Sequence, residues 1–222
     1  MAPHYGSPSA DQMLALSCTV VGVGPGGNTS MVARVAICDF RGVPQLDCYV
    51  VPTMAVTDYR TSTTGITAAH LSSGRPSKIR WPFLDPGLTL ALAERCKGEA
   101  MKFDVVQRHV AEMIKDKVVV GHSLWNDLSV LGIPHPAVNT RDVALYQPFR
   151  NALRTPNQLV RLPTLTFHLM GRNCQEGQQN PLENARAALD LYRSHASDWE
   201  TAIRDGHWPS ALPPSTFSRC YL

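Results

Sequence analysis

The sequence lacks the features that mark membrane-spanning, secreted and strongly basic proteins. No apolar run approaches the ~20 residues that cross a bilayer, and Met1–Gln12 has neither the basic start nor the apolar core of a secretory signal. The six cysteines include no close pair, which excludes zinc-site spacing and a readable disulfide framework. The net charge of +3 is too small to indicate a dedicated nucleic-acid-binding surface. These absences predict a soluble, intracellular protein with reduced thiols.

The chain is long enough for one folded domain, with 222 residues of which 44% are hydrophobic. Residues 1–11 contain two prolines and small polar side chains, so we expect a flexible leader. Residues 12–206 carry the strand and helix patterns, and 72–98 within them is predicted to be an irregular insertion. Residues 207–222 contain three prolines and are predicted to be a C-terminal tail, either free or docked.

The first strand is predicted at Met13–Gly22, where side chains alternate between two faces. One face carries Ser17 and Thr19 side by side. Both are uncharged hydroxyls, at the spacing that places two side chains next to each other on a sheet.

A glycine-rich stretch, Gly22–Gly27, follows this strand and matches the dinucleotide-binding pattern G-x-G-x-x-G. That pattern requires a following helix, whose N-terminus holds the pyrophosphate. Here the β-rich segment Met31–Phe40 follows instead, so we interpret the glycines as a hairpin loop. With a third strand at Gln45–Val51, the first elements are predicted to form an antiparallel meander.

Helices and strands alternate in the second half of the chain. Helices are predicted at Phe103–Ile114, at Ser123–Val130 and from Pro181 to Gly206, and strands at Lys117–Val120 and Ala137–Thr140. His122, between a strand and a helix, is expected to be structural. The whole pattern predicts an α/β fold with a mixed sheet, three antiparallel strands followed by parallel strands, flanked by helices.

Four segments occur in the order of the motifs of one enzyme family: Leu14–Gly24, Thr57–Leu71, Val119–Leu131 and Gln179–Tyr192. The second segment contains Thr-Asp-Tyr-Arg-Thr-Ser-Thr-Thr-Gly-Ile. The third contains Val-Val-Gly-His-Ser-Leu-Trp-Asn-Asp-Leu. Together they resemble the DEDD 3′–5′ exonucleases, in the branch of RNA exonuclease 4 and the interferon-stimulated exonucleases. The resemblance implies a ribonuclease H-like mixed sheet, with 12–206 as the exonuclease-like domain.

Enzymes of this family place four carboxylates around two metal ions, with a histidine that activates the attacking water. The resemblance assigns the carboxylate positions to Ser17, Thr19, Asp127 and Asn184, and the histidine position to Gln179. Asp127 alone keeps the family chemistry. Neutral hydroxyl and amide oxygens hold Mg²⁺ poorly, and glutamine cannot accept a proton near neutral pH. We therefore expect no functional catalytic residue, no metal ion and no small-molecule cofactor.

The function predicted from this reasoning is that of a pseudonuclease, a protein-interaction scaffold in an RNA-related complex. Its protein partner would bind through residues 72–98 or through the C-terminal tail. No interaction with a membrane is expected. One alternative is a module that binds single-stranded RNA without cutting it. Another is an active metal-dependent 3′–5′ exoribonuclease. A chain inactivated deliberately in the laboratory is a further possibility. The resemblance suggests a nuclear location.

The candidate RNA-binding residues are four arginines in the second half of the chain. They are Arg141, Arg150, Arg154 and Arg161. They either line a phosphate track or belong to an ordinary solvated face.

Overall fold

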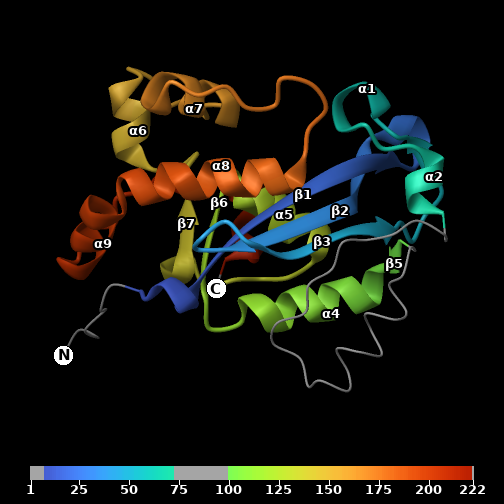
Figure 1. Ribbon diagram of the computed structural model, residues 1–222, viewed down its shortest axis with the longest axis horizontal. Helices are drawn as coiled ribbons and strands as arrows, with labels where there is room; N and C mark the ends of the chain where they lie inside the picture. The colour runs from blue at the N-terminus through green and yellow to red at the C-terminus, as the bar shows by residue number, and fades with distance from the viewer. Residues whose placement is uncertain (1–7, 73–99, 222) are drawn as a thin grey trace.

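The protein is built around a mixed sheet of seven strands in the order β5-β3-β2-β1-β6-β7, with β4 paired to β1 (Figure 1). The computed structural model describes residues 8–72 and 100–221. Most of the leader predicted at 1–11, and almost all of the insertion predicted at 72–98, lie outside the described residues. Among the helices in those described ranges, none is long and apolar enough to cross a membrane.

The strand directions confirm the predicted sheet. Its strands are β1 (Met13–Val23), β2 (Thr29–Asp39), β3 (Pro44–Val51), β4 (Val56–Asp58), β5 (Met101–Lys102), β6 (Val118–Gly121) and β7 (Thr140–Asp142). β1, β2 and β3 pair antiparallel, whereas β6 is parallel to β1 and β7 is parallel to β6. The predicted meander followed by parallel strands is therefore present.

The glycine-rich stretch after β1 is a hairpin loop, as predicted. Gly27 has a φ of +68°, a conformation that glycine adopts at little cost. A Cβ on Gly22 would lie 2.5 Å from the Gly27 carbonyl oxygen, so the two backbones approach too closely for a side chain. The glycines thus allow a tight hairpin turn and do not form a dinucleotide-binding loop.

Helices cover both faces of the sheet (Figure 1). Their bounds are α1 (Thr61–Thr64), α2 (Ala68–Leu71), α4 (Phe103–Ile114), α5 (Leu124–Leu131), α6 (Gln147–Ala152), α7 (Leu162–Met170), α8 (Pro181–Ser194) and α9 (Ala196–Arg204). α4 has the bounds that its apolar face predicts, and Gly171 ends α7 in a left-handed conformation. α8 and α4 lie on opposite faces of the sheet.

The alternation of β1 divides the core into two layers. Leu14 and Leu16 pack with residues of α4 and α5 on one face, in a cluster that includes Val110. Ala15 belongs to a second cluster with Leu189 of α8 on the other face. Both faces of the central strand are therefore buried, as is usual where helices cover a sheet on both sides.

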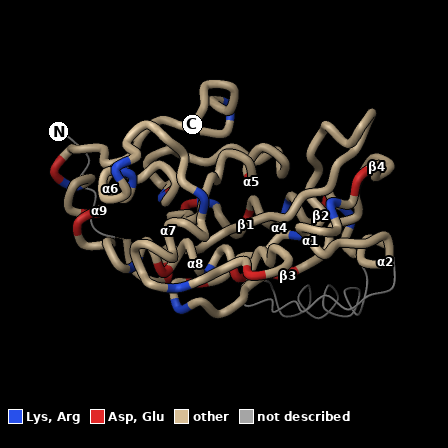
Figure 2. Tube along the Cα trace, turned by 90° about the horizontal axis from the view of Figure 1, so that it is seen from above, with Lys and Arg blue, Asp and Glu red and all other residues tan. Residues whose placement is uncertain are grey.

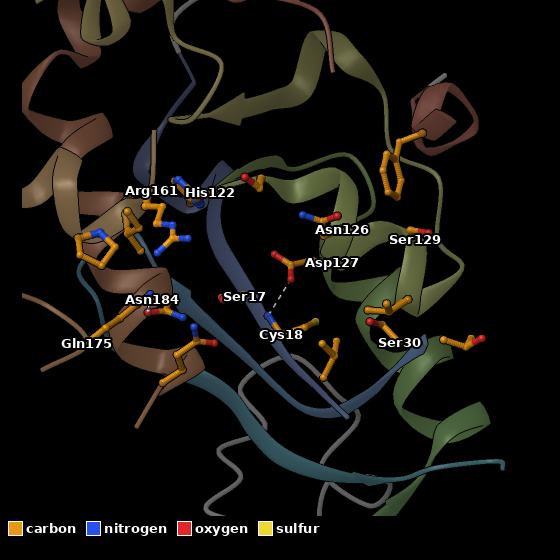
Figure 3. A pocket seen from close by; sticks show the side chains of 18 residues that line it. Ser17, Cys18, Ser30, His122, Asn126, Asp127, Ser129, Arg161, Gln175 and Asn184 are labelled. Carbon is orange, nitrogen blue, oxygen red and sulfur yellow. Dashed lines mark hydrogen bonds between the residues drawn. The ribbon is translucent and has the colours of Figure 1, made fainter. Parts of the chain in front are cut away.

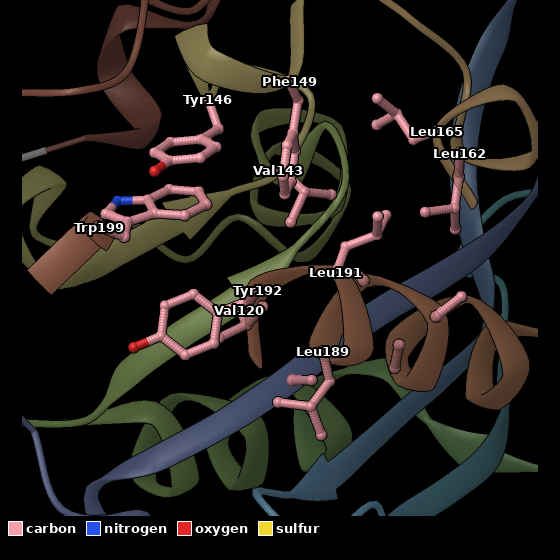
Figure 4. Packing of buried hydrophobic residues seen from close by; sticks show 14 of the residues in the cluster. Val120, Val143, Tyr146, Phe149, Leu162, Leu165, Leu189, Leu191, Tyr192 and Trp199 are labelled. Atoms are coloured by element: carbon pink, nitrogen blue, oxygen red, sulfur yellow. The ribbon is translucent and has the colours of Figure 1, made fainter. Parts of the chain in front are cut away.

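Aromatic rings close the second layer at its far end (Figure 4). Tyr146 stacks on Trp199 with ring centroids 3.9 Å apart and an interplanar angle of 7°. Phe149 meets Tyr146 edge to face at 4.8 Å. These rings attach α6 and α9 to the sheet.

Two predicted elements have the wrong bounds. The helix expected from Pro181 to Gly206 breaks at His195, whose φ of −130° and ψ of 15° are not helical. The break redirects the chain so that Trp199 reaches Tyr146. The strand expected at Ala137–Thr140 is a 3₁₀ turn over Ala137–Asn139 followed by β7.

The C-terminal tail docks on the domain. The Ala211 N–H donates to the Leu145 carbonyl at 2.8 Å, and the His135 N–H donates to the Cys220 carbonyl at 2.9 Å. Cys220 packs in the same apolar cluster as α5. The tail therefore covers the edge of the sheet beside α5.

Candidate functional site

A cavity of about 870 Å³ opens between β1, α5 and the start of α8 (Figure 3). Four of the five residues assigned by the motifs line it, although they come from three distant parts of the sequence: Ser17, Asp127, Gln179 and Asn184. In Figure 3, Asp127 lies on one side of the cavity and Asn184 on the other, with Ser17 between them. The fold therefore brings these motif positions together in space.

Thr19 differs from the other four. Its side chain is buried, and its hydroxyl has no hydrogen-bond partner among the described residues. It does not line the cavity, although it lies two residues beyond Ser17 on the strand. The register of β1 against β2 shifts between Thr19 and Val20. Ser17 and Thr19 both precede this shift and are in regular register with β2, so the irregularity begins just beyond the pair of hydroxyls.

Asp127 joins α5 to the central strand. Its Oδ1 accepts a hydrogen bond from the Cys18 N–H at 3.1 Å. Burial raises the pKa of this carboxyl well above its ordinary value, and the charge of Asp142 adds to the shift. The Cys18 N–H acts in the opposite direction. Asp127 therefore holds its proton more strongly than an exposed aspartate does.

A second carboxyl, Asp142, was not among the sequence candidates. It ends β7 and accepts the N–H groups of Ser123 at 2.9 Å, Leu124 at 2.7 Å and Ala144 at 2.9 Å. Burial raises its pKa to about 7, although these three donors favour the charged form. Asp142 could have been found from its place at the carboxyl end of a short parallel strand, because ligand sites in such sheets form at the carboxyl ends of neighbouring strands. Its role is to hold the first turn of α5, which carries Asp127.

Amides and a backbone contact shape the opposite wall. The Gln175 side-chain amide donates to Asn184 Oδ1 at 2.7 Å. The Gln179 N–H donates to the Thr63 carbonyl at 2.7 Å, which ties the loop before α8 to α1. Glu183 accepts the Gln175 N–H at 3.3 Å and does not line the cavity. The neutral Asn184 is thus held in place by a defined hydrogen bond.

His122 fixes the rim on the side of α7. Its Nε2–H donates to the Val160 carbonyl at 2.8 Å, next to Arg161. Burial lowers the pKa of this histidine, and the bonded carbonyl opposes that shift. The structural role expected for His122 agrees with this contact. Arg161 itself is exposed and lines the cavity.

The four candidate arginines do not form one track. Arg141 is 2% exposed and forms an ion pair with Glu200, Nε to Oε1 at 2.7 Å. Arg150 is also buried and donates to the Gln158 carbonyl at 2.9 Å. Arg154 and Arg161 are both exposed and line the same hollow beside the cavity. The structure therefore brings only these last two together.

The donors in the cavity do not match a four-carboxylate site for two metal ions. Among the described residues that line it, Asp127 is the one carboxylate, joined by neutral oxygens such as those of Ser17 and Asn184. Across residues 8–72 and 100–221, no three His, Cys, Asp or Glu side chains are grouped so that they could hold a metal ion. We therefore assign no reaction step to a metal ion.

Comparison with known proteins places the chain among exonucleases. No family model matches it. It is 36% identical to human RNA exonuclease 4 over 192 residues, which is 86% of this chain and 39% of the human protein. It is 32% identical to RNA exonuclease 4 of Debaryomyces hansenii over 193 residues, covering 86% of this chain and 60% of that protein. The chain thus spans less than two thirds of these relatives.

A solved structure with the same fold is the Pan2 pseudoubiquitin hydrolase–RNA exonuclease module of Saccharomyces cerevisiae in complex with AAUUAA RNA. Its TM-score is 0.64 and its identity 27%, over 88% of this chain and 30% of that chain. The Pan2 catalytic unit of Neurospora crassa, at 17% identity and a TM-score of 0.62, supports the fold alone.

These relatives correct three expectations drawn from the sequence: that the chain is not an enzyme, that it acts as a scaffold, and that its metal cofactor is lost. The relatives are named as RNA exonucleases, and exonucleases of this family normally use divalent metal ions. The number of carboxylates bears on metal affinity and does not measure turnover, so it could not predict a loss of catalysis. The Pan2 module was solved in complex with RNA, whereas a protein partner of this chain stays a prediction.

Motif order, sheet topology and these matches agree. The chain is a member of the DEDD exonucleases on the ribonuclease H-like fold, homologous to RNA exonuclease 4 over most of its length.

Proposed function

We propose that this chain is a 3′–5′ exoribonuclease that receives the 3′ end of single-stranded RNA in the cavity at Asp127. The observation that carries the proposal is the gathering of Ser17, Asp127, Gln179 and Asn184 around one cavity. Each falls at a motif position of the exonuclease family. The Pan2 module, which shares the fold, binds RNA.

The charges around the cavity suit a phosphate. Arg161 supplies a positive charge at the rim, and the walls carry hydroxyl and amide groups that donate hydrogen bonds, such as Ser17 and Asn184. Burial raises the pKa of Asp127, so this carboxyl repels phosphate less than an exposed aspartate would. The backbone phosphate of RNA therefore meets donors and one guanidinium.

The reaction is tested with single-stranded RNA labelled at its 5′ end and a copy blocked at its 3′ end. Both are incubated with Mg²⁺ or Mn²⁺ and, separately, with chelator, and the products are separated on a denaturing gel. We expect shortening from the 3′ end of the open RNA and none of the blocked RNA. No shortening at enzyme excess would overturn the proposal.

A matched pair of variants identifies the site. Asp127→Asn keeps an oxygen that accepts the Cys18 N–H and removes the acid, and we expect the rate to fall about a hundredfold or more. Asp104→Asn removes a carboxylate that is 68% exposed on α4 and does not line the cavity, and it should leave the rate unchanged. Equal rates for the two variants would exclude Asp127 from the reaction.

A further inference from the structure

A second hollow, of about 590 Å³, lies beside the main cavity. Arg161 lines both, and it is the one residue shared between the two linings in the part of the chain that the structure describes. The hollow is formed by the segment after α6 and the exposed side of α7. Arg161 therefore stands at the boundary through which a strand would pass from one space to the other.

The second hollow is basic. Arg154, Arg161 and His168 line it, and none of the described residues that line it is Asp or Glu. Figure 2 shows basic positions at α6, the helix that leads into this segment. No hydrogen bond or ion pair joins the Arg154 or Arg161 side chain to another described residue. Two guanidinium groups are thus free to bind phosphates.

Arg150 supports the frame of this hollow. It donates to the Gln158 carbonyl at 2.9 Å, and its own carbonyl accepts the Thr155 N–H at 2.9 Å. The Gln147 side chain also donates to the Pro156 carbonyl at 3.1 Å. The segment that carries Arg154 is therefore braced at several points.

An apolar surface accompanies the charges. Leu159 lines the hollow and is 51% exposed. Phe167 on α7 is 57% exposed, and its ring meets the His168 ring edge to face at 5.2 Å. Phe167 does not line the hollow, but Leu159 and the His168 ring do, and apolar and aromatic side chains beside arginines are the combination on which unpaired bases pack while the backbone binds cations.

We propose that the second hollow is an upstream subsite for RNA. With the 3′ end in the main cavity, the backbone crosses Arg161, and Arg154 binds a phosphate of the nucleotides just upstream. This inference rests on the proposed function, because it takes the 3′ end to lie in the cavity.

The subsite is tested by fluorescence anisotropy in chelator, where binding is measured without cleavage. A dinucleotide reaches only the main cavity, whereas an octanucleotide also fills the hollow. For the octanucleotide we expect Arg154→Met to weaken binding about tenfold and to lower the salt slope by about 0.7. For the dinucleotide, Arg154→Met should bind like the wild type. Arg161→Met should weaken both.

Two further variants serve as controls. Arg108→Met removes an arginine that is 77% exposed on α4, across the sheet, and should change neither affinity nor slope. Arg154→Lys keeps the charge and should retain most of the salt slope. Thermal unfolding of every variant checks that the fold is intact.

The outcomes separate the two proposals. If the wild type binds neither oligonucleotide, the proposed function fails. If it binds both and Arg154→Met behaves like Arg108→Met, the upstream subsite is overturned and the proposed function stands. An equal loss for both lengths in Arg154→Met would also overturn the subsite, because Arg154 would then act on the main cavity.

Discussion

At the scale of single residues, His122 connects the strand that ends at Gly121 with the rim of the cavity. Its ring donates to the Val160 carbonyl and so restrains the segment that leads to Arg161. A neutral imidazole suffices for this bond. Burial of the ring opposes its protonation. His122, which also lines the cavity, therefore makes the stability of the rim depend on pH.

The sign of this dependence follows from the lowered pKa. An unfolded histidine titrates near 6.5, and folded His122 titrates below that value. Its contribution to stability is complete above about pH 6.5 and is lost as pH falls through the folded pKa. We expect the wild type to lose more stability than His122→Gln between about pH 7 and about pH 5. Thermal unfolding over this range measures it, and parallel curves for the two proteins would contradict it.

Arginines show what residue type alone does not reveal. Arg141 and Arg161 are the same type of residue, yet Arg141 is buried in a bidentate ion pair with Glu200. Glu200 also accepts a hydrogen bond from the Tyr192 hydroxyl at 2.8 Å. That partner lies on α9, beyond the break at His195. A residue's burial depends on such distant contacts, so the sequence could nominate four arginines but not separate the buried from the exposed.

At the scale of elements, α8 supplies the wall of the cavity that carries Asn184. The helix begins where the Asn180 side chain accepts the Leu182 N–H at 3.0 Å, with Pro181 in its first turn. Asn184 lies one turn later. The position of this wall therefore depends on the cap.

Removing the cap should destabilise the protein. We expect Asn180→Ala to lower the free energy of unfolding by about 1 kcal/mol, because the Leu182 N–H loses its partner. Asn180→Asp keeps an acceptor at the positive end of the helix and should retain the stability. Urea unfolding of the three proteins measures both effects. A loss in Asn180→Asp as large as in Asn180→Ala would contradict the capping role.

Element prediction succeeded where local pattern determines structure. The α4 helix has a clear apolar face, and the hairpin glycines are read from their own spacing. The break at His195 was missed because apolar residues continue at helical steps on both sides of it. β7 was displaced because three residues are too few to show alternation. Asp142 was missed because two of its three partners, Ser123 and Leu124, lie at the start of α5, about 20 residues away in sequence.

At the scale of the whole molecule, the tail completes the surface beside α5. Ala211 and Tyr221 pack on Trp125 and Leu145, which are buried. The tail also extends backbone pairing through the bridge between His135 and Tyr221. The C-terminal tail is therefore packed against the domain although its sequence is rich in proline.

A chain that ends after Gly206 would expose this surface. We expect its melting temperature to fall by about 5 °C or more, since Trp125 and Leu145 lose their apolar cover. Differential scanning calorimetry of the full chain and the shortened chain measures the change. Equal melting temperatures would mean that the docked tail contributes no stability.

The pairing of β1 has a consequence for how the protein is made. Its antiparallel partner β2 follows at once, but its parallel partner β6 is synthesised only after the whole meander and the segment to α4. During translation, the Met13–Ala15 part of the other edge of β1 presents unpaired backbone groups until β6 emerges, and one apolar face of the strand stays uncovered until α8 follows. Closure of the sheet is therefore a late, long-range event, and the nascent meander is the stage most exposed to aggregation.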